Sequence, residues 1–137
     1  MSVVKELIRT EANGKISFGN YDLPEKSKKS DFEHNGDMYK VKTFNEITKL
    51  ERNGMFVYES VPGTTVHDLD VKEDGLSFIV EGPQDAQITV ELEEDVTYDI
   101  VIDGVDAGAM KTNLGGKLSL SVELEQSEQV AVSIKKQ

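Results

Sequence analysis

Apolar and polar residues alternate in short runs along most of the chain, which is the pattern of β-strands that bury one face. In the clearest run, 117–124, the apolar positions are Leu118, Leu120, Val122 and Leu124. Beyond residue 62, such runs predict seven strands, at 65–72, 76–82, 86–93, 96–103, 106–112, 117–124 and 129–135. Short strands that recur every roughly 8 to 12 residues favour an immunoglobulin-like sandwich. The dipeptides between them that predict tight turns are Asp74-Gly75, Asp103-Gly104 and Gly115-Gly116.

The front of the chain contains an internal duplication. Residues 5–20 align without gaps with residues 45–60, and the identical pairs are Glu6 with Glu46, Glu11 with Glu51, Asn13 with Asn53 and Gly14 with Gly54. Asn-Gly between alternating apolar residues is a strong signal for a type I′ hairpin, in which both residues have positive φ. The duplication therefore predicts two β-hairpins. Their arms lie at 3–11 and 15–20, and at 46–52 and 55–60.

The first arm of each hairpin has a second interpretation, because apolar residues also recur there at helical spacing. These residues are Val4, Leu7 and Ile8 in one copy and Ile47 and Leu50 in the other. Strand is the preferred interpretation, and helix is the alternative. An additional strand is predicted at 38–44. Residues 21–37 are polar, contain a proline and lack periodicity, so we expect a long loop, with a short helix beginning at Ser30 or Asp31 as the alternative.

Charge and aromatic content change at the same point of the chain. Residues 1–60 carry ten acidic and ten basic side chains, whereas residues 61–137 carry sixteen acidic and five basic ones and hold the whole net charge of −11. Seven of the nine tyrosines and phenylalanines lie in the first of these ranges. Pro62-Gly63 is a turn or linker dipeptide. We therefore predict a duplicated β-hairpin module at 1–62 and an acidic immunoglobulin-like sandwich at 63–137, and leave open whether they share one core.

Composition excludes several classes of function. The absence of cysteine rules out disulfides, thiolate metal sites and thiol nucleophiles. The sequence shows no leader pattern and no run of ~20 apolar residues, so we expect a cytoplasmic protein, or one exported by an unusual route. The acidic half repels phosphates and anionic lipids, so neither nucleic acid nor a membrane is an expected partner. The run of Lys26, Lys28 and Lys29, flanked by Glu25 and Asp31, is interpreted as a solvated loop.

Two segments resemble known families. TYDIVIDGVDAGAMKTNLGGKLSLSVEL is similar to the closing strands of bacterial immunoglobulin-like and fibronectin-like modules, and YKVKTFNEITKLERNGMFVYESVPG resembles short proteins of anaerobic Firmicutes labelled "endosialidase". That label implies sialidase activity, and sialidases resemble one another in three arginines around the substrate carboxylate, a tyrosine nucleophile and a large propeller. This chain has only Arg9 and Arg52 and is too short for a propeller. We therefore expect no sialidase activity from a single chain.

Other catalytic and metal-binding arrangements are weak. Glu91 and Glu93 share one strand face, as a glycosidase pair requires, but an exposed acidic strand face opposite Val90 and Leu92 is the preferred interpretation. A Ser-His-Asp set needs a nucleophile elbow, which the sequence lacks. The residues available for it are Ser60 or Ser77, His67, and Asp68 or Asp70, with His34 as the other imidazole. The weak calcium candidates, whose spacing does not fit an EF-hand, are Asp68, Asp70, Asp74, Asp103 and Asp106. No cofactor is predicted.

The duplicated front carries the main functional prediction. Hairpin edges present unpaired backbone groups, so we expect a non-enzymatic protein that self-assembles into a homo-oligomer, or docks on a partner, through the N-terminal module. A carbohydrate-binding module is the alternative. Its stacking platform would consist of Tyr21, Tyr39, Phe44 and Tyr58, most of which alternation places inward. A small glycan hydrolase that uses Glu91 and Glu93 is the third possibility considered.

Overall fold

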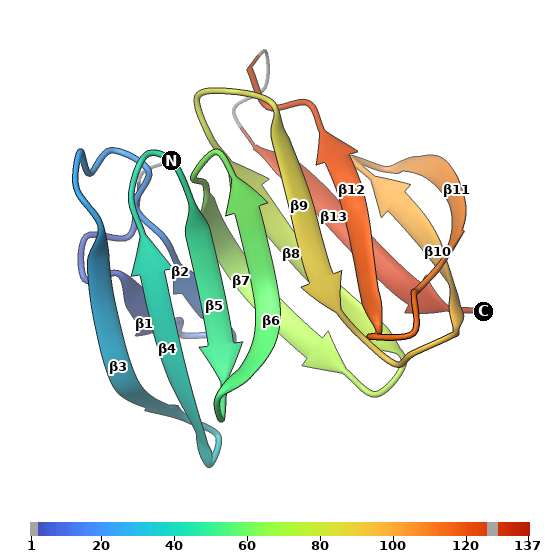
Figure 1. Ribbon diagram of the computed structural model, residues 1–137, viewed down its shortest axis with the longest axis horizontal. Coiled ribbons are helices and arrows are strands. Elements are labelled where there is room, and N and C mark those ends of the chain that lie inside the picture. Colours follow the sequence, from blue (N-terminus) through green and yellow to red (C-terminus); the bar gives the residue numbers. More distant parts are fainter. Residues whose placement is uncertain (1–2, 126–128) are drawn as a thin grey trace.

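The chain folds into two antiparallel β-sheets packed face to face, as Figure 1 shows for a computed structural model that describes residues 3–125 and 129–137. In order across it, the seven-stranded sheet contains β1 (Ile8–Thr10), β2 (Ile16–Phe18), β7 (Thr65–Lys72), β8 (Gly75–Glu81), β13 (Val130–Lys136), β10 (Thr97–Ile102) and β11 (Val105–Lys111). The six-stranded sheet contains β12 (Lys117–Val122), β9 (Ala86–Glu91), β6 (Met55–Val61), β5 (Thr48–Arg52), β4 (Asp37–Thr43) and β3 (Ser27–His34). The predicted all-β sandwich is confirmed.

One core fills the space between the sheets. Its centre is Tyr58 of β6, which is fully buried. The Tyr58 ring meets Phe18 of β2 edge to face, at 5.3 Å between centroids, and Phe78 of β8 at 5.6 Å. Such aromatic pairs contribute about 0.5–1.5 kcal/mol each beyond the burial of their area. Along β12 and β13 every second side chain points into this core, as the alternation predicts.

The two duplicated segments lie in opposite sheets. The first supplies β1 and β2 to the seven-stranded sheet, and the second supplies β5 and β6 to the six-stranded sheet. The strand interpretation of the first arms is confirmed for residues 8–10 and 48–52, whereas residues 3–7 lie outside any strand. The described residues contain no helix, so none there is long and apolar enough to cross a membrane. Asn53 and Gly54 have φ of 53° and 77°, as predicted for a type I′ turn. The prediction is wrong for the first copy, where Gly14 has positive φ but Asn13 does not.

The long loop predicted at 21–37 is also wrong, because residues 27–34 form β3 and pair with β4. An edge strand with two largely exposed faces needs no apolar alternation, and a bulge at Asp31, with φ of 59°, interrupts the strand further. Asn35 and Gly36, with φ of 51° and 83°, close the β3–β4 hairpin. This third Asn-Gly was the available signal.

The predicted boundary near residue 62 does not coincide with a break in either sheet. β6 pairs with β9 across it in the six-stranded sheet, and β2 pairs with β7 in the seven-stranded sheet. Of the seven strands predicted beyond residue 62, five lie in one sheet and two in the other. The remaining places are taken by strands from the front of the chain, so residues from both sides of the boundary form one core cluster.

Candidate functional site

The outer face of the six-stranded sheet collects lysines from the front of the chain. On β4, Tyr39, Val41 and Thr43 are buried in the interior, so the alternating Lys40 and Lys42 point outward. On β5, Leu50 is buried, which turns Lys49 to the same outer face. The strand alternation that builds the core therefore also places these lysines on one surface.

Three lysines of this face, one from each of three neighbouring strands, stand directly opposite one another. Lys28 of β3 is paired in register with Lys42 of β4, and Lys42 is paired with Lys49 of β5. We call this row the lysine ladder. Together with Lys40 and Glu51, it lines a shallow hollow of about 70 Å³. Neighbouring strands lie about 4.8 Å apart, so the ladder spans roughly 10 Å across the sheet.

The ladder is electrostatically unfavourable within the protein itself. Like charges directly opposite on adjacent strands destabilise a sheet. Lys49 has a nearby carboxylate, with 3.7 Å between its Nζ and Oε2 of Glu51. Within the described part of the chain, Lys28, Lys40 and Lys42 have no carboxylate within 4.0 Å of the ammonium group. Glu51 stands opposite Lys40 and Glu59 stands opposite Lys49, so the positive potential is strongest over the pair of Lys28 and Lys42.

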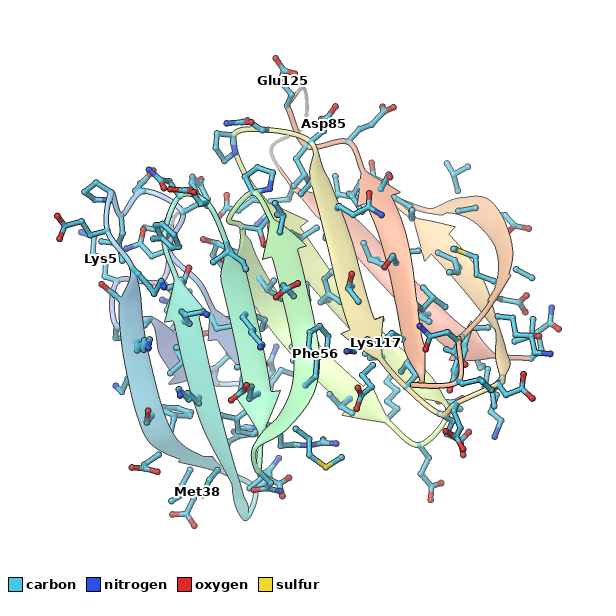
Figure 2. All side chains as sticks on the ribbon, in the orientation of Figure 1. Lys5, Met38, Phe56, Asp85, Lys117 and Glu125 are labelled. Carbon is cyan, nitrogen blue, oxygen red and sulfur yellow. The ribbon has the colours of Figure 1, made fainter. Side chains whose placement is uncertain are left out.

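Phe56 adds an aromatic ring beside the ladder. A bulge places Val57 as an extra residue in β6, so Tyr58 points inward whereas Phe56, paired with Glu51, points outward. The Phe56 ring centroid lies 4.8 Å from Nζ of Lys117 and 5.8 Å from Nζ of Lys49. Figure 2 shows Phe56 and Lys117 close together on the sheet face turned toward the viewer. The outer face therefore combines cations with one half-exposed ring.

The carboxylates predicted as a glycosidase pair lie at a second hollow, at one end of the sandwich. This groove of about 360 Å³ is lined by both Glu91 and Glu93 and also by Arg52 and Phe56. Oε2 of Glu93 accepts a hydrogen bond from Nζ of Lys136 at 2.6 Å, and this bond raises the pKa of Lys136. Glu91 stands opposite Lys117 in the β9–β12 pair. Both carboxylates thus face cationic neighbours.

The four aromatics predicted as a sugar platform do not share an exposed surface. Tyr58 and Tyr39 are buried, whereas Tyr21 and Phe44 are partly buried. The Tyr58 hydroxyl shares a hydrogen bond of 2.7 Å with Oγ1 of Thr64, and burial raises the pKa of Tyr58 well above its ordinary value. The ring faces of Tyr39 and Tyr58 belong to the core and are closed to a ligand.

The histidines lie in separate surroundings, and neither joins the predicted serine–histidine–aspartate set. Nε2 of His67 lies 2.9 Å from Oε1 of Glu81, and both side chains are buried on β7 and β8. The carboxylate partner of His67 is therefore Glu81, not Asp68 or Asp70. His34 contacts the Thr10 hydroxyl at 3.1 Å. Ser60 is engaged with Thr64 in the interior, at 2.7 Å between their hydroxyls.

Three of the five aspartates considered for calcium have carboxylates that take part in hydrogen bonds or ion pairs within the protein. Asp68 accepts a hydrogen bond from Asn13, Asp70 pairs with Lys15 and Lys72, and Asp106 accepts from the Gly108 N–H. In the part of the chain that the structure describes, no three acidic or histidine side chains gather as a metal site. Asp103 and Gly104 form the predicted positive-φ turn. The turn predicted at Asp74-Gly75 lies one residue earlier, at Glu73 and Asp74, because Lys72 pairs with Gly75.

No protein-family model, curated protein or solved structure matches the chain. The resemblance to proteins labelled endosialidase therefore stays a prediction. Sequence reasoning missed the lysine ladder although the alternation at 38–44 already put Lys40 and Lys42 on one face. The missing information was the register between β3, β4 and β5, which joins residues up to 21 positions apart.

Proposed function

We propose that the protein is a non-enzymatic docking protein that binds an acidic, carboxylate-bearing polysaccharide on the outer face of the six-stranded sheet. The observation that carries this proposal is the lysine ladder, in which Lys28, Lys42 and Lys49 stand opposite one another. All three residues come from the front of the chain. The docking role expected for the N-terminal module is thus proposed for the outer face of its sheet. The glycan considered as an alternative ligand is proposed to be anionic.

The cost of the ladder favours an anionic occupant. Cross-strand charge pairs change stability by roughly 0.2–1 kcal/mol, with the unfavourable sign when the charges are alike. A ligand carboxylate placed over Lys42 also lies near Lys28 and Lys49, so it attracts all three ammonium groups and offsets their mutual repulsion. The bound anion therefore gains both the direct attraction and the relief of repulsion within the sheet.

The chemistry of the face favours a polysaccharide over a nucleic acid. The chain as a whole has a net charge of −11, which repels a densely charged phosphate backbone. A polymer with one carboxylate per sugar has a lower charge density. Phe56 beside the ladder offers an apolar ring to the C–H face of a sugar.

The test is calorimetric titration of the protein with oligogalacturonate, with a neutral oligosaccharide and single-stranded DNA as comparison ligands. We expect oligogalacturonate to bind, and its binding to weaken as salt is added because the charges are screened. Lys42→Glu is expected to weaken binding at least about tenfold, equivalent to about 1.4 kcal/mol. Its matched control is Lys135→Glu, an exposed lysine on β13 of the other sheet, which should bind like the unaltered protein.

Lys42→Glu also separates loss of binding from loss of folding. A carboxylate at this position faces Lys28 and Lys49, so the variant is expected to be more stable by about 0.2–1 kcal/mol in urea unfolding. A more stable protein that binds less is the expected result. Equal losses of affinity in Lys42→Glu and Lys135→Glu, no binding of oligogalacturonate, or tighter binding of DNA would each overturn the proposal.

A further inference from the structure

The two sheets end unequally on one side of the sandwich. On the opposite side β1 and β3 lie against each other, and aromatic contacts join β2, β6 and β8 across the middle. Because one sheet has seven strands and the other has six, the surplus strand falls at the end where β12 closes the smaller sheet. Figure 1 shows β10 and β11 continuing past β12. No described strand lies opposite β11.

The inner face of β11 is consequently uncovered. All seven residues of β11 are exposed. Met110 and Val105 share the inner face with Tyr98 and Ile102, their partners on β10, yet remain 37% and 68% exposed. Leu114, in the connection from β11 to β12, is 81% exposed. Leu114 and Val105 have the largest exposed fractions of the big apolar side chains described, so apolar surface is concentrated at this end.

The β12 edge lacks the protection found at the other side, whereas β11 has one bulge, at Ala107, in its pairing with β10. The β3 edge is blunted by charged residues and by the bulge at Asp31, which are common ways to prevent strand addition. β12 pairs with β9 without a bulge, has no proline, and carries one charged residue, Lys117. On β11 the charged residues are Asp106 and Lys111. β11 and β12 together thus carry one acidic and two basic residues, whereas the chain as a whole is acidic.

We propose that this end binds a second copy of the chain about a two-fold axis parallel to the strands. Such an axis places the outer edge of β11 against the outer edge of the partner's β12, and the reverse. β11 and β12 run in opposite directions within the chain, and rotation about this axis preserves direction, so both new pairs are antiparallel. Each seven-stranded sheet then continues into the partner's six-stranded sheet.

The unequal ends of the sheets select this arrangement over its simplest competitor. A direct antiparallel pair of β12 with the partner's β12 puts β11 beneath that partner strand, where the partner's β10 already lies. Pairing β11 with β12 avoids the overlap, because each chain fills the position that the other leaves open. The two β11 strands then face each other across the extended interior and bury Met110 and Val105 from both copies.

Sedimentation equilibrium over a range of protein concentrations tests the proposal. We expect a monomer–dimer equilibrium that strengthens with added salt, because screening reduces the repulsion between two chains of net charge −11. Val105→Lys and Met110→Lys should each raise the dimer dissociation constant at least about tenfold. Met55→Lys is the matched control, since Met55 is 64% exposed at the first position of β6, and its substitution should leave the constant unchanged.

Circular dichroism identifies a variant that fails to fold, and the two substitutions on β11 serve as replacements for each other. A monomer at the highest concentration in high salt would overturn the proposal, and so would a dimer that neither substitution weakens. The outcome is independent of polysaccharide binding. Lys42→Glu should still dimerise, Val105→Lys should still bind oligogalacturonate, and salt should act on the two equilibria in opposite directions.

Discussion

The duplicated segments 5–20 and 45–60 share one sequence pattern but occupy different environments. In the first, Ser17 on the outward side of β2 is buried, and its hydroxyl donates a hydrogen bond to Glu11. In the second, the outward side of β6 presents Phe56 beside the lysine ladder. The first copy therefore contributes only to the fold, whereas the second also builds the proposed binding face. The shared pattern specifies two hairpins, and the neighbouring strands determine what each hairpin exposes.

A single bulge accounts for much of this difference. Ile16 and Phe56 occupy matched positions, yet Ile16 is buried in the core and Phe56 points outward. The extra residue Val57 in β6 reverses the alternation before Tyr58, so only Tyr58 of the two aromatics in this strand faces inward. Two positions further on, the matched residues Phe18 and Tyr58 contact each other across the core.

The largest effect is expected where the copies meet. Phe18→Ala and Tyr58→Ala each remove a fully buried ring and should lower the free energy of unfolding by about 3–5 kcal/mol. Tyr58→Ala should cost more, because it also removes the hydroxyl that is bonded to Thr64. Urea unfolding monitored by circular dichroism gives both values. A loss below about 1 kcal/mol for either variant would show that the two copies do not pack together.

Matched positions Ile8 and Thr48 sharpen the comparison further. Ile8 is a core residue, whereas the Thr48 hydroxyl donates to the Thr64 carbonyl at 2.8 Å and accepts from the Thr64 N–H at 3.1 Å. Thr48→Val leaves these buried groups without a partner and should cost about 1–3 kcal/mol. Ile8→Val removes one methylene and should cost about 0.5–1.5 kcal/mol. The reverse order in urea unfolding would contradict the assigned network.

Substitutions in the turns of the two copies should lower the free energy of unfolding less than those in the core, and by different amounts. Asn53 has φ of 53°, accepts a hydrogen bond from the Met38 N–H and donates to Asp37. Asn53→Ala should therefore cost about 1–2 kcal/mol. Asn13→Ala should cost less, because Asn13 lacks positive φ. Thermal unfolding of both variants checks the order, and equal losses would mean that the type I′ geometry contributes nothing.

Alternation and Asn-Gly signals predicted most strands and the all-β class, because both are local properties of the chain. They failed at β3, whose exposed edge position removes the need for alternation, and at Asn13, where the loop closes differently. The boundary near residue 62 followed real changes in composition, but cross-sheet packing is not local and joins both sides in one core. The lysine ladder depends on register across three strands, and register cannot be read from the composition of any one of them.

The smallest expected effect concerns the matched carboxylates Glu11 and Glu51. The hydrogen bond from Ser17, followed by the contact with Arg9, holds the pKa of Glu11 below its usual 4.5, against the opposing effect of burial. A lowered folded-state pKa stabilises the protein above the unfolded-state pKa, and this contribution disappears as the pH falls through the folded value. Because Glu11 is partly exposed, its contribution should stay below about 1 kcal/mol.

Glu11→Gln should therefore lower the free energy of unfolding at neutral pH, and the difference from the unaltered protein should shrink as the pH falls below 4.5. Urea unfolding at a series of pH values measures this difference. Glu51→Gln is the matched control, because its carboxylate has a lysine at 3.7 Å but no hydroxyl donor among the described residues. If both variants show the same pH dependence, the closed outward side of the first copy does not distinguish it from the second, and the contrast between the copies is confined to the bulge at Val57.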